Sequence, residues 1–372
     1  MILAILTFIP IIAILVFIHE LGHYITAKFY GIKVLEFGFG YPPRLFGIRR
    51  GETLYSLNLL PLGGFVKMVG EEDPTDSRSL AGRTILQRFI VISSGAIMNI
   101  LLAILIFIVL FMIPQQKMVG LVQIQEVIPN SPAEFAELKT GDLIVKVDGH
   151  SIRNIGDLIQ RINLKLGSES EWVIQKNSEF PLSSSSPEFT SYEVIHLIPR
   201  LNPPEGQGPT GIVIGTKTSQ MEWISYPPWE AIPKGIIRVW ETLILTKNEI
   251  ARWIVGDVSP QFSGPIGIAQ ITGQVAQLQF EGEAQRSRFI RLLELAAFIS
   301  INLGIINILP IPMLDGGRIL FLGIELVRRG KRISPKIEGV VHMTGFFLLI
   351  SLIVIISYFD ILRIINGESL FR

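Results

Sequence analysis

The stretch VFIHELGHYITA, residues 16–27, ends an almost unbroken apolar run that starts at Met1. Such a run predicts a helix that crosses a membrane, because each helical span needs about 20 mostly apolar residues. A charged side chain at membrane depth costs roughly 2.5–3.5 kcal/mol on insertion scales. His19, Glu20 and His23 therefore indicate a functional site rather than a lipid-facing surface.

These three residues form the pattern H-E-x-x-H, which is typical of a metal site. On a helix the directions of His19 and His23 differ by about 40°, so both imidazoles can reach one ion. Glu20 lies about 100° from His19, where its carboxylate can accept a proton from a water that the metal activates. The alternative is a chance match, which the position inside an apolar run disfavours.

Composition predicts a membrane protein with a soluble portion, since 49% of the 372 residues are hydrophobic and 17% are charged. The net charge of +1 gives no sign of a nucleic-acid partner. The absence of cysteine excludes disulfides, thiolate metal ligands and a cysteine nucleophile. Any imidazole ligand must come from five residues: His19, His23, His150, His196 and His342.

Four segments are apolar and long enough to cross a bilayer, at roughly residues 2–27, 89–113, 289–309 and 343–362. The first is not expected to be a signal peptide, because no basic residue precedes it and no A-x-A-like site ends it.

The distribution of Lys and Arg predicts the orientation of the chain. Residues 28–88 contain nine and residues 318–336 contain six, whereas the longer region 114–286 contains only fourteen. The positive-inside rule places the first two regions in the cytosol. Both termini and the region between the second and third spans are then expected outside a plasma or inner membrane.

The region between the second and third spans predicts a small α/β module. Turn signals separate short alternating runs: LVQIQEVI, DLIVKVDG, SEWVIQK and YEVIHLI. Residues 202–211 are expected to be a linker, and residues 229–256 have a helical period. That helix either lies at the membrane interface or covers the module.

A catalytic zinc has three protein ligands and a water, so the histidine pair needs a third ligand. In NILPIPMLDGGR, residues 307–318, Pro310 and Pro312 end the third span just before Asp315. The first and third spans run in the same direction, so Asp315 is expected at the histidine end. The alternatives are His342 as the ligand, or Asp315 as a solvated turn residue.

Together these motifs resemble the site-2 protease family of intramembrane zinc metalloproteases, in its bacterial branch with one embedded PDZ domain. HELGH at 19–23 is similar to the family's H-E-x-G-H, and NILPIPMLDGG at 307–317 to its N-x-x-P-x-P-x-L-D-G-G. PLGGFVKM at 61–68 resembles a membrane-reentrant β-loop beside the active site. FSGPIGIA at 262–269 resembles the segment before the third span, and LKTGDLIVKVDGHSI at 138–152 the core of a PDZ module.

The resemblance implies one zinc ion per chain, held by His19, His23 and Asp315, with Glu20 as general base. It also implies residues that hold an unwound substrate helix: Asn302, Asn307, Gly63, Gly64 and Phe65. The alternatives are a tight turn at the glycines and helix–helix hydrogen bonding by the asparagines. The family often has Gly-Pro-x-x-Asn in the second span, and Ala96 stands here in place of proline, which weakens the support for a role of Asn99.

We therefore predict a polytopic α-helical membrane protein with four transmembrane helices, a membrane-reentrant β-loop and an inserted α/β PDZ-like domain. The N-terminal half of the membrane core is expected at 1–114, with the β-loop at about 52–70. The PDZ-like domain is expected at 115–203, a linker and amphipathic helical region at 204–286, and the C-terminal half of the membrane core at 287–372.

The implied activity is cleavage of transmembrane segments near the cytosolic side, with anti-sigma factors or remnant signal peptides as substrates. An upstream site-1-type protease would first trim the external domain, and the PDZ-like domain would exclude bulky substrates rather than capture tails. Two alternatives are an inactive membrane scaffold or chaperone, and a zinc protease with a glutamate ligand that cuts soluble substrates. Zinc content distinguishes the first, and an Asp315→Ala variant the second.

Overall fold

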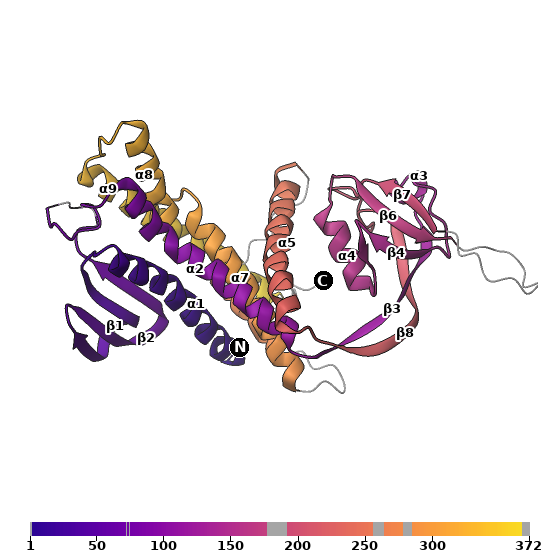
Figure 1. The fold of residues 1–372 in the computed structure, drawn as a ribbon, viewed down its shortest axis with the longest axis horizontal. Coiled ribbons are helices and arrows are strands. Elements are labelled where there is room, and N and C mark those ends of the chain that lie inside the picture. Colours follow the sequence, from indigo (N-terminus) through magenta and orange to yellow (C-terminus); the bar gives the residue numbers. More distant parts are fainter. Residues whose placement is uncertain are drawn as a thin grey trace, which may run out of the picture. The chain divides into compact units, whose positions relative to one another are not determined.

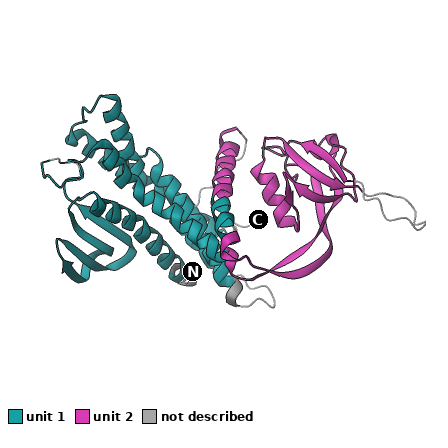
Figure 2. Ribbon diagram, in the orientation of Figure 1, with its two compact units in different colours: residues 1–110, 231–239, 261–372 teal, residues 111–230, 240–260 magenta. Residues whose placement is uncertain are grey.

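The computed structural model describes residues 2–71, 73, 75–176, 192–255, 264–277 and 285–366, and Figure 1 shows the fold. The chain forms two compact units (Figure 2). Unit 1 comprises residues 1–110, 231–239 and 261–372, and unit 2 comprises residues 111–230 and 240–260. The inserted unit 2 thus interrupts the sequence of unit 1.

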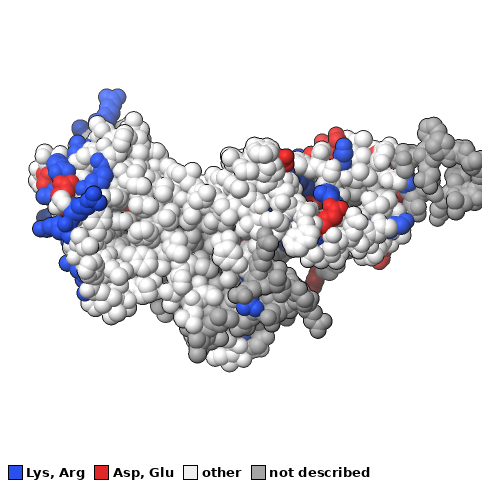
Figure 3. All heavy atoms as spheres, turned by 60° about the horizontal axis from the view of Figure 1, so that its bottom comes forward, with Lys and Arg blue, Asp and Glu red and all other residues white. Residues whose placement is uncertain are grey.

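Unit 1 is built on four long apolar helices: α1 (Ile2–Phe29), α2 (Ile85–Met112), α7 (Gln285–Ile308) and α9 (Pro335–Ile365). Each contains a stretch long and apolar enough to cross a membrane, which confirms the four predicted spans. On the face of the molecule in Figure 3, Lys and Arg gather at one end of unit 1, and the surface beside them carries few charges. This distribution suits helices whose exterior faces lipid.

A β-hairpin of β1 (Val34–Arg50) and β2 (Thr53–Met68) follows α1. The predicted loop at about 52–70 coincides with β2. Phe37 pairs with both Tyr55 and Val66, so the hairpin folds back and its first segment lies between the two ends of β2. The end of β2 runs along α1, where a Cβ on Gly63 would lie 2.6 Å from Val16 Cγ1.

Two shorter helices complete unit 1, α6 (Pro265–Gln277) and α8 (Asp315–Val327). Residues 262–263 of the FSGPIGIA motif lie outside the described residues, and α6 begins within the rest of it. Asp360 Oδ2 on α9 accepts hydrogen bonds from the N–H groups of Gly264 and Gly267, at 2.9 and 2.8 Å. A buried carboxylate therefore satisfies the free N–H groups at the start of α6.

Unit 2 contains an antiparallel sheet of order β7-β6-β4-β3-β8, and β5 pairs with β4. Its strands are β3 (Gln115–Val127), β4 (Leu143–Val147), β5 (His150–Ser151), β6 (Ser170–Gln175), β7 (Tyr192–Leu197) and β8 (Ile212–Ile224). The four strands predicted from alternating runs are confirmed. The sheet extends past the predicted boundary at residue 203, because β8 pairs with β3 from Gln115↔Ile224 to Val127↔Ile212.

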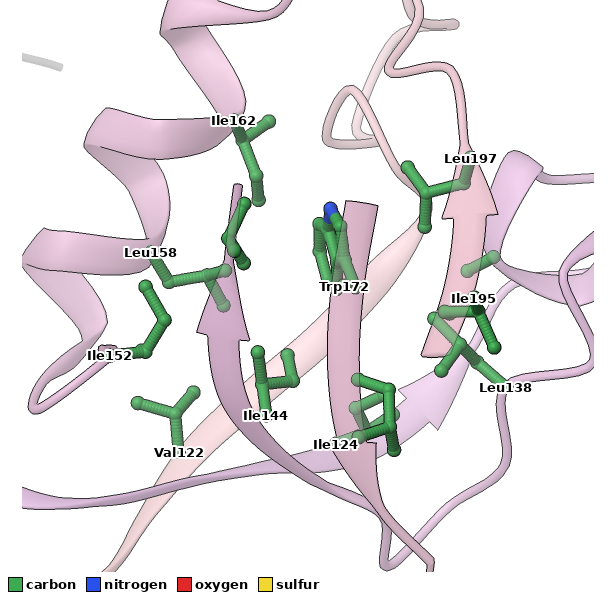
Figure 4. Close-up of a cluster of buried hydrophobic side chains, with 13 residues drawn as sticks. Val122, Ile124, Leu138, Ile144, Ile152, Leu158, Ile162, Trp172, Ile195 and Leu197 are labelled. Atoms are coloured by element: carbon green, nitrogen blue, oxygen red, sulfur yellow. The ribbon is translucent and has the colours of Figure 1, made fainter. Parts of the chain in front are cut away.

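The core of unit 2 lies between this sheet and α4 (Ile155–Leu164). Asn154 caps α4 by accepting from the Asp157 N–H at 2.8 Å, and Leu158 and Ile162 point from α4 toward the strands (Figure 4). Trp172 is fully buried, and its Nε1–H donates to Ser170 Oγ at 2.9 Å. The remaining helices are α3 (Pro132–Phe135) and the predicted long helix, α5 (Pro228–Val255), which contributes to both units.

Candidate functional site

The structure brings the three predicted metal ligands together inside unit 1. Asp315 Oδ2 lies 3.1 Å from His19 Nε2 and 3.2 Å from His23 Nε2, and the two Nε2 atoms are 3.2 Å apart. Both histidines are buried, at 7% and 6% exposure. The described part of the chain contains one such group of three side chains close enough to share a metal ion.

This triangle of atoms fits a zinc ion. Tetrahedral zinc with ligand distances of about 2.0–2.1 Å separates its ligand atoms by about 3.3 Å, close to the three distances here. Asp315 Oδ2 is buried and, despite these short distances, has no hydrogen bond of acceptable geometry within the described residues. Two imidazole nitrogens and a carboxylate oxygen that converge at these distances are expected of ligands arranged around a cation.

The Nδ1 nitrogen of each imidazole, which is not the one that faces Asp315, lies near a polar group that can orient the ring. His23 Nδ1 lies 2.8 Å from the Val91 carbonyl oxygen on α2, so Nδ1–H donates and Nε2 keeps its lone pair for a metal. His19 Nδ1 lies 3.4 Å from the side-chain nitrogens, Nδ2, of Asn99 and Asn307. A ring that binds metal through Nε2 carries its proton on Nδ1, and either amide can accept that proton only with its oxygen turned toward the ring.

Two glycines allow α1 and α2 to approach closely at the site. A Cβ on Gly22 would lie 2.4 Å from the Ser94 carbonyl oxygen. A Cβ on Gly95 would lie 2.4 Å from His23 Nε2 and 2.7 Å from His19 Nε2. Contacts this short exclude a side chain, so the glycine of HELGH and Gly95 are required by packing.

The connection between α7 and α8 delivers Asp315. The prolines end α7 at Ile308 as predicted, and α8 begins at Asp315 itself. The first turn of α8 then packs under the end of α7, where a Cβ on Gly316 would lie 2.0 Å from the Leu309 carbonyl oxygen. A Cβ on Gly317 would lie 2.5 Å from the Ile311 carbonyl oxygen. Larger residues at either glycine would push Asp315 away from the histidines.

Glu20 faces the hairpin, and the Val66 N–H donates to its Oε2 at 3.1 Å. Gly63, Gly64 and Phe65 directly precede Val66, so three of the predicted substrate-binding residues lie on the strand beside Glu20. A Cβ on Gly64 would lie 3.3 Å from the Phe17 ring on α1. The Phe65 ring is stacked on Tyr41, with 6.2 Å between ring centroids.

The two predicted asparagines occupy different environments. Asn307 lies beside His19, as described above. Asn302 Nδ2 donates to the Phe298 carbonyl of its own helix at 2.8 Å. His342, the alternative third ligand, is outside the metal group, and its Nδ1 accepts from the Met313 N–H at 2.9 Å.

Sequence reasoning missed the Val91 carbonyl and the packing role of Gly95, and it gave little weight to Asn99. The Val91 carbonyl leaves no signal, because every residue has a carbonyl. Gly95 and Asn99 do leave one: a glycine and an asparagine four residues apart, in a span where polar groups are costly. Asn99 is fully buried beside His19 although Ala96 replaces the proline of the related motif.

Two histidines and a carboxylate that meet among helices long enough to cross a membrane are features of a membrane-embedded metallohydrolase. Residues 7–352 match the sequence profile of Peptidase family M50, and the chain belongs to that family of site-2 proteases.

Relatives of similar length agree with this family. A Clostridium acetobutylicum protein named as a zinc metalloprotease is 31% identical over 367 residues, which cover 98% of each chain. A Clostridium perfringens protein named in the same way is 35% identical over 355 residues, covering 94% of this chain and 95% of its own. The zinc metalloprotease RasP of Geobacillus kaustophilus is 29% identical over 448 residues, covering 96% and 97%. This chain is thus a multi-pass membrane zinc metalloprotease.

Proposed function

We propose that this protein is an endopeptidase that cuts the transmembrane segments of other membrane proteins near the cytosolic side. The observation that carries the proposal is the meeting of His19, His23 and Asp315, three parts of one metal site, among apolar helices. A soluble peptide would have to leave water to reach a site among apolar helices, whereas a transmembrane helix already lies in the membrane.

The chain's own residues divide the work of peptide hydrolysis. His19, His23 and Asp315 hold the ion, which when bound polarises the scissile carbonyl and lowers the pKa of a water. Glu20 accepts the proton from that water and transfers it to the leaving amine. The Val66 N–H, 3.1 Å from Glu20 Oε2, fixes the direction of the carboxylate.

A helical substrate must unwind before cleavage, because its own hydrogen bonds protect the peptide bond. Gly63, Gly64 and Phe65 lie on a strand beside Glu20, where an extended segment of substrate can pair by β-augmentation. Asn302 and Asn307 are the side chains proposed to satisfy freed backbone groups, and Asn307 lies beside the metal ligand His19.

Unit 2 is proposed to be a PDZ-like domain that gates access from outside the membrane. Its antiparallel sheet with α4 against one face is compatible with that module. The excess of Lys and Arg in 28–88 and 318–336 supports a cytosolic position of the active-site end. Substrates of the anti-sigma-factor or remnant-signal-peptide type would then arrive after a first protease has removed their external domain.

The test uses the purified full chain in lipid vesicles with a transmembrane reporter. Glu20→Gln should keep stoichiometric zinc and lose cleavage by at least the roughly 10²–10⁴-fold that general-base catalysis contributes. Glu193→Gln, at an exposed position in unit 2 (side chain 53% exposed), serves as the matched control and should cleave normally. Normal cleavage by Glu20→Gln would refute the general-base role.

Two further results would favour the rival functions. A wild-type chain that binds no zinc would favour an inactive scaffold. An Asp315→Ala variant that keeps zinc and activity would favour a protease with another third ligand. Cleavage of a soluble reporter in preference to the transmembrane one would refute the proposed substrate class.

A further inference from the structure

The short connection between α7 and α8 contains an unusual backbone conformation two residues before Asp315. Met313 has φ +83°, a left-handed value that a residue with a side chain rarely adopts. Such a conformation persists only where surrounding structure holds it. The Met313 side chain is 48% exposed, so side-chain packing gives it little support.

The group that holds this backbone belongs to α9. The Met313 N–H donates to His342 Nδ1 at 2.9 Å. The ring of His342 packs against Phe321 of α8, with 5.5 Å between ring centroids. Its Nε2 faces Glu338 Oε1 at 3.9 Å, a carboxylate that favours a proton on Nε2 and leaves Nδ1 as the acceptor.

A second contact from the same helix reaches the neighbouring residue. A Cβ on Gly345 would lie 2.4 Å from Pro312 Cβ and 2.8 Å from the Pro312 carbonyl oxygen. His342 and Gly345 are three residues apart, hence on one face of α9. This face therefore holds Pro312 by close packing and Met313 by a hydrogen bond.

We propose that His342 is a positioning residue that sets the backbone before Asp315 and so holds the carboxylate at the metal site. The inference rests on the proposed role of Asp315 as third ligand. It assigns a function in the site to the fourth span, and it explains why a histidine lies there without contributing to the metal group.

Removal of the His342 acceptor should let the Asp315 carboxylate move relative to the histidines, but Asp315 would still be present as a ligand. Partners that orient a metal ligand change metal affinity by roughly 10- to 100-fold when mutated, and we expect His342→Leu to weaken zinc binding by that amount. His342→Asn should stay within about 3-fold of wild type, because its Oδ1 can accept the Met313 N–H from nearly the same place. His196→Leu, at an exposed position in unit 2, is the matched control and should change nothing.

The experiment measures zinc affinity of the purified full chain by competition with a chelator. It also records the visible absorption of the Co²⁺-loaded protein, which reports ligand geometry independently of activity. A double variant, His342→Leu with Met313→Gly, provides a test of mechanism. Glycine adopts φ +83° without strain, so the double variant should recover much of the lost affinity.

Several results would overturn the proposal. Unchanged zinc affinity and cobalt spectrum in His342→Leu would refute it, and so would equal losses in His342→Leu and His342→Asn. If His342→Leu does not fold, His342→Gln replaces it, because its amide oxygen lies one atom farther from the backbone than Nδ1, and unchanged affinity there would refute the proposal. If Asp315→Ala weakens zinc binding but His342→Leu does not, only the positioning role fails. If Asp315→Ala keeps its zinc, the ligand assignment itself fails.

Discussion

The interior of unit 2 is centred on a cluster of apolar side chains around Trp172, and its buried Asp142, Glu241 and Asn248 each have a partner within the unit. In the interior of unit 1, by contrast, ionisable and amide side chains converge on the metal site. The buried polar and charged residues of unit 1 include His19, His23, Arg88, Asn99, Glu325 and Asp360. Apolar burial stabilises a domain in water, but it separates helices from lipid only weakly, because lipid tails are as apolar as leucine. Close packing and polar contacts must therefore determine how the helices of unit 1 associate. The metal site lies in the same polar interior.

The largest effect is expected where the two helices of the site touch. Gly95→Ala places a methyl group 2.4 Å from His23 Nε2, so zinc affinity should fall by more than the roughly 100-fold upper range for an outer partner. Zinc affinity and reporter cleavage measure the loss. Gly323→Ala on α8, where a Cβ meets nothing within 4 Å, is the control and should leave both unchanged. Equal zinc affinity and equal cleavage in the two variants would contradict the close contact between α1 and α2 at Gly95.

A buried ion pair joins α8 to α2. Arg88 Nη2 donates to Glu325 Oε1 at 2.6 Å, and both side chains are 9% exposed. Arg88→Met leaves the buried Glu325 carboxylate with Arg332 alone, whose Nε lies 3.3 Å from Oε1. The free energy of unfolding of unit 1 should therefore fall by about 3 kcal/mol, the low end of the range for a broken buried pair.

The matched control for this pair lies in unit 2. Arg153 pairs with Glu222 at side-chain exposures of 50% and 34%, so Arg153→Met should change stability by only about 0–1 kcal/mol. Denaturation of each variant in detergent gives the comparison. If both variants lose a similar amount of unfolding free energy, burial does not make the Arg88–Glu325 pair contribute more to stability than the exposed pair.

In unit 2 an apolar deletion should affect stability alone. Leu158 is fully buried between α4 and the sheet, and Leu158→Ala should lower the stability of unit 2 by about 2–5 kcal/mol. Zinc affinity of the full chain should stay at the wild-type value. Hydrogen exchange of β4 and β6 follows unit 2, and a parallel loss of zinc would show that the two interiors are coupled.

The smallest effect concerns a partly exposed cluster of charged side chains at the turn of the hairpin. Arg78 and Lys28 hydrogen-bond to Glu52 and lower its pKa to about 2 from an ordinary 4.5. A lowered pKa in the folded state stabilises above the ordinary pKa, and this stabilisation is lost as pH falls from 4.5 toward 2. The stability difference between wild type and Glu52→Gln should therefore shrink across that range. A difference independent of pH would contradict the assigned ionisation.

The sequence contained most of the fold and the positions of the metal ligands. Apolar length predicted the spans, alternation predicted the strands around Trp172, and the proline break predicted where α7 ends. It could not show that β8 closes the sheet beside β3, because pairing is a property of two distant segments. It also could not reveal the Val91 carbonyl or the acceptor role of His342, since each depends on a contact between helices.

The central claim is that two imidazoles and the Asp315 carboxylate hold one zinc ion inside the membrane domain. The zinc K-edge X-ray absorption spectrum of the purified full chain tests it most directly. The account predicts about one zinc per chain, two imidazole nitrogens and the remaining ligands oxygen, at about 2.0–2.2 Å. In Asp315→Ala the spectrum or the zinc content should change. A third imidazole in the wild-type spectrum, or zinc absent altogether, would contradict the account.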